Sequence, residues 1–203
     1  MTQTHRRSPR PSIAVLCSGS GTNLQAILNA SLPVALVISD RKDARALRRA
    51  ARAGVEAVHI DPRAYASRQA YDRALVTQCR ARGIRLVCLA GFMRILSPVF
   101  VRAFRNRILN VHPALLPAFP GAHAVRDALA WGARVTGVTV HLVDEQVDHG
   151  PIVLQEAVPI RAGDTEASLL ARVHRVEHRL YPRAIRLMLQ GRVRIAGRRI
   201  RTR

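Results

Sequence analysis

Lysine, aromatic residues and long apolar runs are scarce in this sequence of 203 residues. Lys42 is the only lysine among 33 basic residues, and aromatic residues make up 4% of the chain. No apolar run approaches the roughly 18 residues that suggest a membrane-spanning helix, so we expect no membrane association. The basic N-terminus precedes only a short apolar run, Ile13 to Cys17, which is too short for a secretory signal. We therefore expect a cytoplasmic protein.

The cysteines are few and unpaired in pattern. Cys17, Cys79 and Cys88 are an odd number and show no Cys-x-x-Cys spacing, which excludes a disulfide framework or a zinc site as the organising feature. Cys17 and Cys88 lie within apolar runs, where cysteine usually behaves as a small buried hydrophobic residue. We predict inert buried thiols.

The formal net charge of +20 would attract polyanions, so nucleic acid is a candidate partner. The arginines, however, are spread along predicted helices rather than interleaved with aromatic residues. We interpret them as a compositional bias on solvated faces, and expect weak non-specific RNA binding and no specific nucleic-acid partner. Both ends read as frayed basic tails: a disordered extension over residues 1–11 and a tail over 191–203, flanking one domain over 12–190.

Apolar runs alternate with amphipathic segments along that domain, which is typical of βαβ units. The pattern predicts a single-domain, Rossmann-like α/β fold: a mostly parallel twisted sheet, helices on both faces, and antiparallel strands near the C-terminus. Ligands in such folds bind beyond the carboxyl ends of the strands. Strands are predicted at 12–19, 34–40, 55–60, 84–91, 107–112, 135–143 and 151–160, and helices at 23–30, 43–54, 67–83, 97–104, 124–132 and 165–189.

A glycine-rich turn, "CSGSGTNLQ", joins the first predicted strand to its helix. Backbone N–H groups of Ser18 to Asn23, together with the helix dipole, form an anion site without a charged side chain. The turn lacks the Gly-Lys-Ser/Thr ending of a nucleotide P-loop, and Leu24 stands where a dinucleotide fingerprint needs its third glycine. Asp40, at the end of the second strand, could bind a ribose, so a nicotinamide-dependent oxidoreductase remains an alternative. Another alternative is a tight turn that binds no ligand.

Asn110 and His112 lie two residues apart on the strand that ends at Pro113. In an extended strand both side chains point to the same face. An amide beside an imidazole can hold an oxyanion, and the imidazole can also move a proton. The alternative is a structural histidine with satisfied hydrogen bonds.

The loop "VDEQVDHGP" carries Asp144, Glu145 and Asp148. Such a loop is often no more than a solvated turn. A carboxylate that reached His112 would instead stabilise its imidazolium form and raise its pKa. His141 and His149 lie nearby, but His141 is within a strand and His149 adjoins Asp148, so we expect no metal site.

The chain resembles the phosphoribosylglycinamide formyltransferase family from about Ser12 to Gln190. The resemblance rests on segments in matching order and spacing, of which the Asn-x-His-Pro stretch followed by Asp-x-Gly-Pro is the most specific for the formyltransferase superfamily. The segments are "SGSGTNLQAIL", "SRQAYDRAL", "LAGFMRILSPVFV", "LNVHPALLPAFPGAHAVRDAL", "TGVTVHLVDEQVDHGPIVLQ" and "RVHRVEHRLYP".

The resemblance implies a metal-free transfer of a formyl group from 10-formyltetrahydrofolate to the amine of glycinamide ribonucleotide. It implies that Asn110, His112 and Asp148 are catalytic, with Asp148 tuning His112. The ribonucleotide would be held by Gly21, Thr22, Asn23 and Glu177. The folate would contact Arg68, Met93, Arg94, Ile95, Leu96, Asn110, Asp144 and Asp148, with Arg68 at its anionic end and the Asp144–Asp148 loop closing over the pterin. The protein would be a monomer or a homodimer.

The sequence departs from the family pattern at three positions. Thr22 replaces the usual serine, Ala114 stands where many relatives carry serine, and Asp40 where asparagine is common. None of these changes removes a catalytic group.

Several rivals have weaker support. Methionyl-tRNA formyltransferase carries a second, RNA-binding domain, and formyltetrahydrofolate deformylase an N-terminal regulatory one; neither is expected here. A sugar-nucleotide formyltransferase fits "SGSGTN" less well than an enzyme of a phosphate monoester. A pure nucleic-acid-binding module gives no reason for Asn110, His112 and Asp148.

Overall fold

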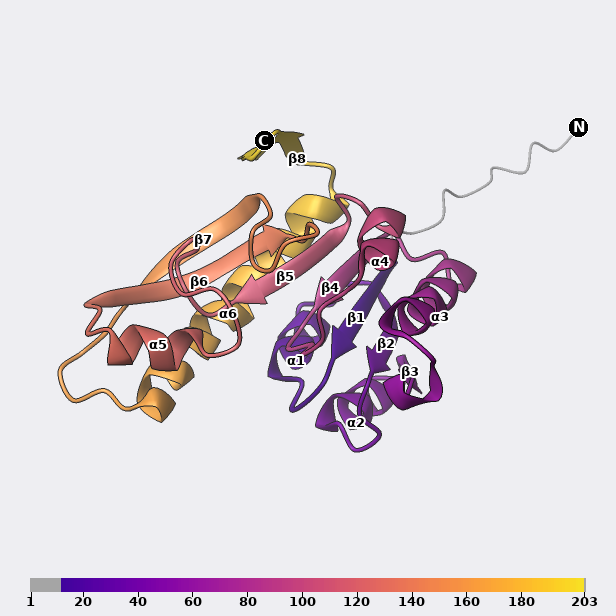
Figure 1. Cartoon of the computed structure of the whole chain (residues 1–203), viewed down its shortest axis with the longest axis horizontal. Coiled ribbons are helices and arrows are strands. Elements are labelled where there is room, and N and C mark those ends of the chain that lie inside the picture. The colour runs from indigo at the N-terminus through magenta and orange to yellow at the C-terminus, as the bar shows by residue number, and fades with distance from the viewer. Residues whose placement is uncertain (1–11, 203) are drawn as a thin grey trace, which may run out of the picture.

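The computed structural model describes residues 12–202 as a seven-stranded sheet between two layers of helices (Figure 1). The strand order is β3-β2-β1-β4-β5-β6-β7. The pairs from β3 to β5 are parallel, and β6 is antiparallel to both β5 and β7. This is the predicted α/β fold with antiparallel C-terminal strands. The predicted N-terminal extension, residues 1–11, lies outside the described residues.

The elements follow the predicted order closely. The strands of the large sheet are β1 (Ile13–Cys17), β2 (Val34–Ser39), β3 (Glu56–His59), β4 (Leu86–Leu89), β5 (Ile108–His112), β6 (Val135–Leu142) and β7 (Ile152–Pro159). The helices are α1 (Thr22–Asn29), α2 (Arg45–Arg52), α3 (Arg68–Ala81), α4 (Pro98–Ala103), α5 (Ala124–Ala130) and α6 (Glu166–Leu189), with a 3-10 turn, η1, at Pro62–Ala64.

Two apolar cores lie on opposite faces of the sheet because successive strand side chains alternate between its faces. Ile13, Val15 and Cys17 of β1 join a core with side chains of α1, α2, α5 and α6. Ala14 and Leu16 join the other core, with side chains of α3 and α4. Burial raises the pKa of the Cys17 thiol to about 12, and the predicted burial of Cys17 and Cys88 is confirmed.

Helix α6 ties together the strands that carry the predicted site. The buried Tyr181 hydroxyl lies 2.9 Å from the carbonyl oxygens of both Leu89 and Leu109, which belong to β4 and β5. The N-terminus of α6 is capped by Thr165, whose side chain accepts a hydrogen bond from the Ser168 amide at 3.2 Å. No helix among residues 12–202 has both the length and the apolar character needed to cross a membrane.

The C-terminus differs from the prediction of a frayed basic tail. Residues Val193–Ala196 and Arg199–Thr202 form strands β8 and β9 of an antiparallel hairpin, which lies beyond the end of α6 (Figure 1). Val193 and Ile200 pack against the first apolar core. The tail is ordered because its apolar residues alternate with arginine, so that one face of the hairpin can be covered.

Candidate active site

Strand β5 presents the predicted pair at the point where the sheet changes from parallel to antiparallel. Its neighbours are the parallel strand β4 and the antiparallel strand β6. Asn110 and His112 share one face of the strand, with His112 only 3% exposed and Asn110 half-buried. The Nε2 atom of His112 lies 2.8 Å from the carbonyl oxygen of Phe119. Because a carbonyl oxygen only accepts, this nitrogen carries a hydrogen.

Asp148 reaches the pair from the loop between β6 and β7. Its Oδ2 lies 3.4 Å from His112 Nδ1, and its Oδ1 accepts a hydrogen bond from Asn110 Nδ2 at 3.4 Å. The Gly121 amide donates to Oδ2 at 2.8 Å. Asp148 has a φ of 50°, a left-handed conformation that is uncommon outside glycine. The structure therefore brings Asn110, His112 and Asp148 together.

His141 belongs to the same cluster, which its position within a predicted strand does not indicate. It lies directly opposite Asn110 in the pairing of β5 with β6. Its Nε2 is 3.2 Å from Asn110 Nδ2 and 3.6 Å from Asp148 Oδ1. Its Nδ1 lies 2.8 Å from the Leu142 carbonyl oxygen, so Nδ1 carries a hydrogen, while Nε2 faces both the Asn110 amide and the Asp148 carboxylate. The register of β5 against β6 is the signal that could have revealed it.

The pKa of His112 is lowered overall, although Asp148 acts on it in the predicted direction. Burial lowers it from its ordinary value, because desolvation disfavours the imidazolium ion. Asp148 and the Phe119 carbonyl raise it, as expected of an anion and an acceptor, but they do not cancel the effect of burial. For Asp148, burial alone would raise the pKa, but the His141 ring, the Gly121 amide and the His112 ring together hold it below its ordinary value.

The glycine-rich turn packs closely against α2. Gly21 has a φ of 70°, and a Cβ there would lie 2.7 Å from the Cβ of Ala46, so both the conformation and the space require glycine. Arg49 of α2 donates to the Ser20 carbonyl oxygen at 2.9 Å. A cavity of about 580 Å³ opens beside Thr22, between α1 and α6, and Arg49 lines it.

Asn23 and Glu177 meet at the same end of α1. The Nδ2 of Asn23 donates to Glu177 Oε2 at 2.8 Å, and both side chains are buried. Desolvation raises the pKa of Glu177, although the hydrogen bond from Asn23 opposes the shift. The two residues come from α1 and α6, so the predicted ribonucleotide site draws on both ends of the chain.

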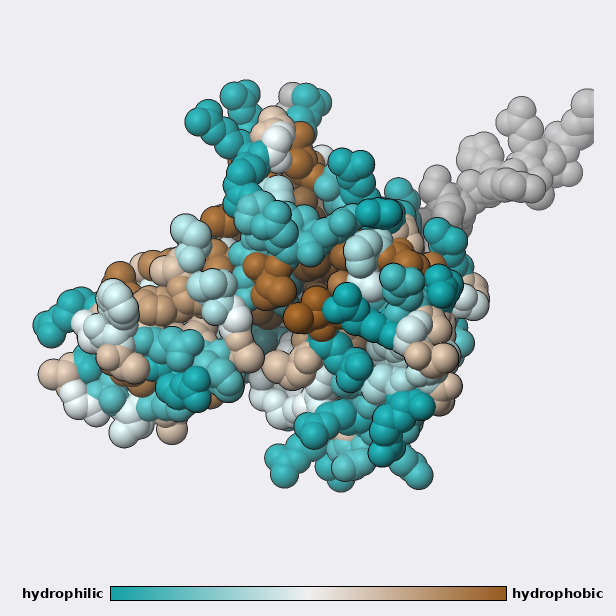
Figure 2. Space-filling model, viewed as in Figure 1, coloured by the Kyte–Doolittle hydropathy of each residue, from teal (hydrophilic) through white to brown (hydrophobic). Residues whose placement is uncertain are grey.

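The segment from Met93 to Leu96, predicted to line the folate pocket, is fastened at its start and just beyond its end. The Met93 amide donates to Ser18 Oγ at 2.9 Å, and the Ser97 amide donates to the buried Asp72 carboxylate at 2.5 Å. Met93 and Ile95 are 73% and 60% exposed, whereas Leu96 is buried. Figure 2 shows hydrophobic residues gathered near the middle of the face in view, with hydrophilic residues around them.

The remaining predicted folate residues lie outside the central cluster. Arg94 stacks over the Tyr71 ring, 5.5 Å from its centroid. Arg68 is the first residue of α3 and is exposed. Asp144 contacts His149 instead of His112: its Oδ2 lies 2.8 Å from His149 Nδ1. The structure thus joins Asp148, but not Asp144, to Asn110 and His112.

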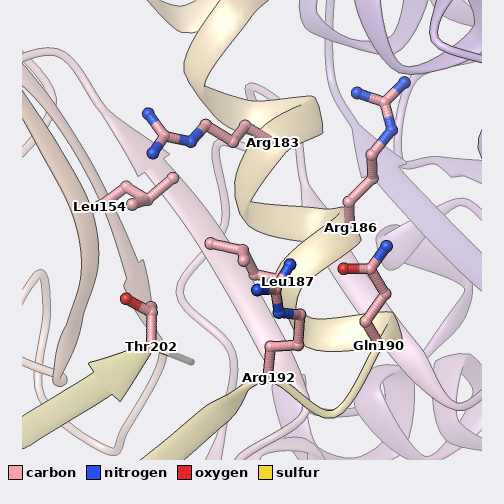
Figure 3. A pocket seen from close by; sticks show the side chains of 7 residues that line it. All are labelled: Leu154, Arg183, Arg186, Leu187, Gln190, Arg192 and Thr202. Atoms are coloured by element: carbon pink, nitrogen blue, oxygen red, sulfur yellow. The ribbon is translucent and has the colours of Figure 1, made fainter.

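A second cavity, of about 380 Å³, lies between the C-terminal half of α6 and the hairpin (Figure 3). Seven described residues line it, and none of them is a predicted site residue: Leu154, Arg183, Arg186, Leu187, Gln190, Arg192 and Thr202. Within residues 12–202, no group of three or more His, Cys, Asp or Glu side chains is arranged to hold a metal ion.

Comparison with known proteins identifies the family. The Formyl transferase family model matches residues 12–185. The chain is 44% identical over 189 residues to the phosphoribosylglycinamide formyltransferase of Escherichia coli, covering 90% of this chain and 89% of that one. It is also 44% identical to the trifunctional purine biosynthetic protein adenosine-3 of Drosophila melanogaster, but the match, 94% of this chain, spans only 15% of that much longer protein.

The fold is similar to that of solved structures as well. The crystal structure of glycinamide ribonucleotide transformylase 1 from Symbiobacterium toebii superposes with a TM-score of 0.93 at 54% identity, covering 96% of this chain and 95% of that one. Sequence and fold agree over nearly the whole described chain. The chain therefore belongs to the formyl transferase family and, within it, to the phosphoribosylglycinamide formyltransferases.

Proposed function

We propose that this chain transfers the formyl group of 10-formyltetrahydrofolate to the amine of glycinamide ribonucleotide, a step of purine synthesis. The observation that carries the proposal is the convergence of Asn110, His112 and Asp148, with contacts of at most 3.4 Å between Asp148 and the other two. Family membership gives the reaction class, and the cluster supplies groups suited to an oxyanion intermediate.

The ribonucleotide would bind at the N-terminus of α1. Backbone N–H groups of Gly21, Thr22 and Asn23 lie at the N-terminus of α1, which is the positive end of the helix dipole and suits a phosphate group. The Glu177 carboxylate, held by Asn23 at 2.8 Å, would accept hydrogen bonds from the ribose hydroxyls. A substrate that supplies such donors stabilises the buried charge of Glu177, so ribonucleotide binding offsets part of the cost of its burial.

The folate would lie along the segment from Met93 to Leu96. Exposed Met93 and Ile95 offer apolar contact to its rings, and the backbone of this segment is held by Ser18 and Asp72. The guanidinium groups of Arg68 and Arg94 would serve the anionic end of the folate. The Asp144–Asp148 loop would close over the pterin. Asp148 would then contact the folate as well as act on His112.

Transfer begins with attack of the neutral glycinamide amine on the formyl carbon. An α-amino group has an ordinary pKa of about 8, so the neutral form costs little near pH 7. The bond from the formyl carbon to the folate nitrogen then breaks, and a proton passes from the attacking amine to that nitrogen through water. The products are formylglycinamide ribonucleotide and tetrahydrofolate.

Asn110 and His112 would stabilise the oxyanion formed on the way. Asn110 would donate from the Nδ2–H that otherwise makes the long, 3.4 Å contact with Asp148. His112 would donate from Nδ1–H when its ring is protonated, because its Nε2–H is held by the Phe119 carbonyl oxygen at 2.8 Å. Asp148, 3.4 Å from Nδ1, partly offsets the effect of burial and keeps the cationic form of the ring accessible in the transition state. Losing one such donor typically costs roughly a hundred- to a thousandfold in rate.

The test measures formyl transfer to glycinamide ribonucleotide by the wild-type chain, His112→Ala and Asp148→Asn. We expect transfer by the wild type, collapse of turnover in both variants and folate binding that survives. His59→Ala, on the edge strand β3, is the control and should transfer at the wild-type rate. Folate consumption that ignores the ribonucleotide would point to deformylation or another acceptor, and an absence of folate binding would overturn the proposal.

The substrates are the only specific partners in this proposal. The basic surface adds weak, non-specific RNA binding that should fall steeply with salt, because phosphate contacts release counterions. We place the protein in the cytoplasm as a monomer or homodimer. Sedimentation at several protein concentrations distinguishes the two states.

A further inference from the structure

The C-terminal hairpin has one apolar and one basic face. Register pairs Val193 with Thr202 and Ile195 with Ile200 on the first face, and Arg194 with Arg201 on the second. Val193 and Ile200 pack against the first apolar core. Gly197, with a φ of 59°, forms the turn with Arg198, so Arg198 projects from the tip of the hairpin.

Arg198 binds His149, the residue after Asp148. Its Nη2 donates to the His149 carbonyl oxygen at 2.8 Å, and its Nη1 lies 2.7 Å from His149 Nε2. The same Nη1 also lies 3.3 Å from His149 Nδ1. The guanidinium group therefore contacts both the ring and the backbone carbonyl of His149.

The His149 ring links the hairpin to the start of the loop. The Nδ1–H of His149 faces Asp144 Oδ2 at 2.8 Å, and Asp144 Oδ1 accepts from the Gln146 amide at 3.0 Å. One continuous set of hydrogen bonds therefore runs from Arg198 through His149 to Asp144. It spans the loop that delivers Asp148 to His112.

The loop needs such support because its local conformation is unfavourable. Asp148 holds a φ of 50°, a left-handed conformation that costs free energy for a side chain other than glycine, although aspartate tolerates it better than most residues. Behind the hairpin, the cavity lined by Thr202 and Arg192 (Figure 3) separates part of β9 from α6. The polar contact at the hairpin tip is thus a specific tie between the C-terminus and the loop.

We propose that Arg198 is a positioning residue: through His149 it holds the Asp144–Asp148 loop in the conformation that sets Asp148 against His112. The catalytic consequence rests on the proposed function, whereas the effect on loop order does not. Arg198 touches neither substrate in this account. It acts by keeping the carboxylate in place.

The first test is hydrogen exchange of the amides over residues 143–150 in the full chain. Arg198→Ala should speed exchange there, because the loop loses its tie to the hairpin. Arg201→Ala removes the same charge from the outer face of the same hairpin and should leave exchange unchanged. Arg198→Lys keeps the charge but has one donor nitrogen in place of the forked guanidinium group, so it should restore part of the protection. Equal exchange in the wild type and Arg198→Ala would overturn the inference.

The second test is formyl transfer by the same variants. A displacement of about 1 Å at a reacting group can cost up to a hundredfold, so we expect Arg198→Ala to lower kcat roughly tenfold or more. The KM for glycinamide ribonucleotide should stay unchanged, since α1 and Glu177 are untouched; an equal loss in Arg201→Ala would indicate a charge effect and refute positioning. An inactive wild type would refute the proposed function alone, because exchange still decides the role of Arg198. Exchange of the β8 and β9 amides checks that the hairpin remains folded in each variant.

Discussion

Asn110 and His141 lie opposite each other on β5 and β6, and the amide nitrogen of Asn110 is 3.2 Å from Nε2 of His141. The pairing fixes the orientation of the asparagine amide, because its NH₂ group lies against His141 Nε2 and, at 3.4 Å, donates to Asp148 Oδ1. The carbonyl oxygen of the amide is then turned away from His141. A buried histidine thus determines which face of Asn110 meets the substrate.

Two replacements of His141 should distinguish the roles of its two ring nitrogens. The amide of glutamine reaches the place of Nε2, whereas that of asparagine reaches only the place of Nδ1. We expect His141→Gln to keep most formyl transfer and His141→Asn to lose about tenfold more, equivalent to about 1.4 kcal/mol in the barrier. Steady-state kcat of the two variants measures this difference. Equal rates would mean that the contact with Asn110 has no part in catalysis.

Asp148→Asn should lower the pKa of His112 further. The aspartate charge raises that pKa against the opposing effect of burial, so removing the charge leaves burial with less opposition. An NMR titration of the His112 ring should show its transition at lower pH in the variant than in the wild type. Asp127→Asn, which removes an exposed carboxylate that pairs with Arg126 on α5, serves as the control. A transition that moves upward would contradict this account.

Glu177→Gln should stabilise the fold at neutral pH while weakening substrate binding. The pKa of Glu177 is raised in the folded chain, so its contribution to stability is complete below the unfolded pKa of about 4.3 and is lost as pH rises through the folded value. Glutamine does not ionise, so the Tm of the variant should differ little from that of the wild type at pH 4. The variant's advantage in Tm should grow as the pH rises to 8. Glu166→Gln, exposed on the same helix, is the matched control.

Gly150→Ala should be among the most damaging single changes in the loop. A Cβ at this position would lie 1.8 Å from the Leu142 carbonyl oxygen, a backbone atom that cannot yield without disturbing β6. We expect a loss of about 3 kcal/mol or more in the free energy of unfolding, measured by urea denaturation. Gly19→Ala, where nothing lies within 4 Å, should cost far less.

Much of the fold could be predicted because apolar periodicity reports burial directly. The strands β1 and β4 are buried on both faces and are uninterrupted apolar runs in the sequence. Helix α6 was predicted from Thr165 and begins one residue later, since that threonine is its cap. The meeting of Asn110, His112 and Asp148 followed from the family motif and the shared face of the strand.

Other features depend on distances that no local pattern encodes. The register of β5 against β6 places His141 beside Asn110, and only the paired strands show it. The burial of His112 determines the sign of its pKa shift, but the sequence showed only the neighbouring carboxylate. The C-terminal hairpin had a signal, the alternation of Val193 and Ile195 before Gly197, which the surrounding arginines obscured.

The bond between Asn23 and Glu177 joins residues 154 positions apart, and this separation has a consequence for synthesis on the ribosome. The glycine-rich turn emerges early, but its partner carboxylate follows only after most of the chain has been translated. At about 5–20 residues per second, the nascent chain spends on the order of ten to thirty seconds with Asn23 made and Glu177 not yet added. During that interval the turn has no α6 against which to close, so the ribonucleotide site is completed only after α6 has been synthesised.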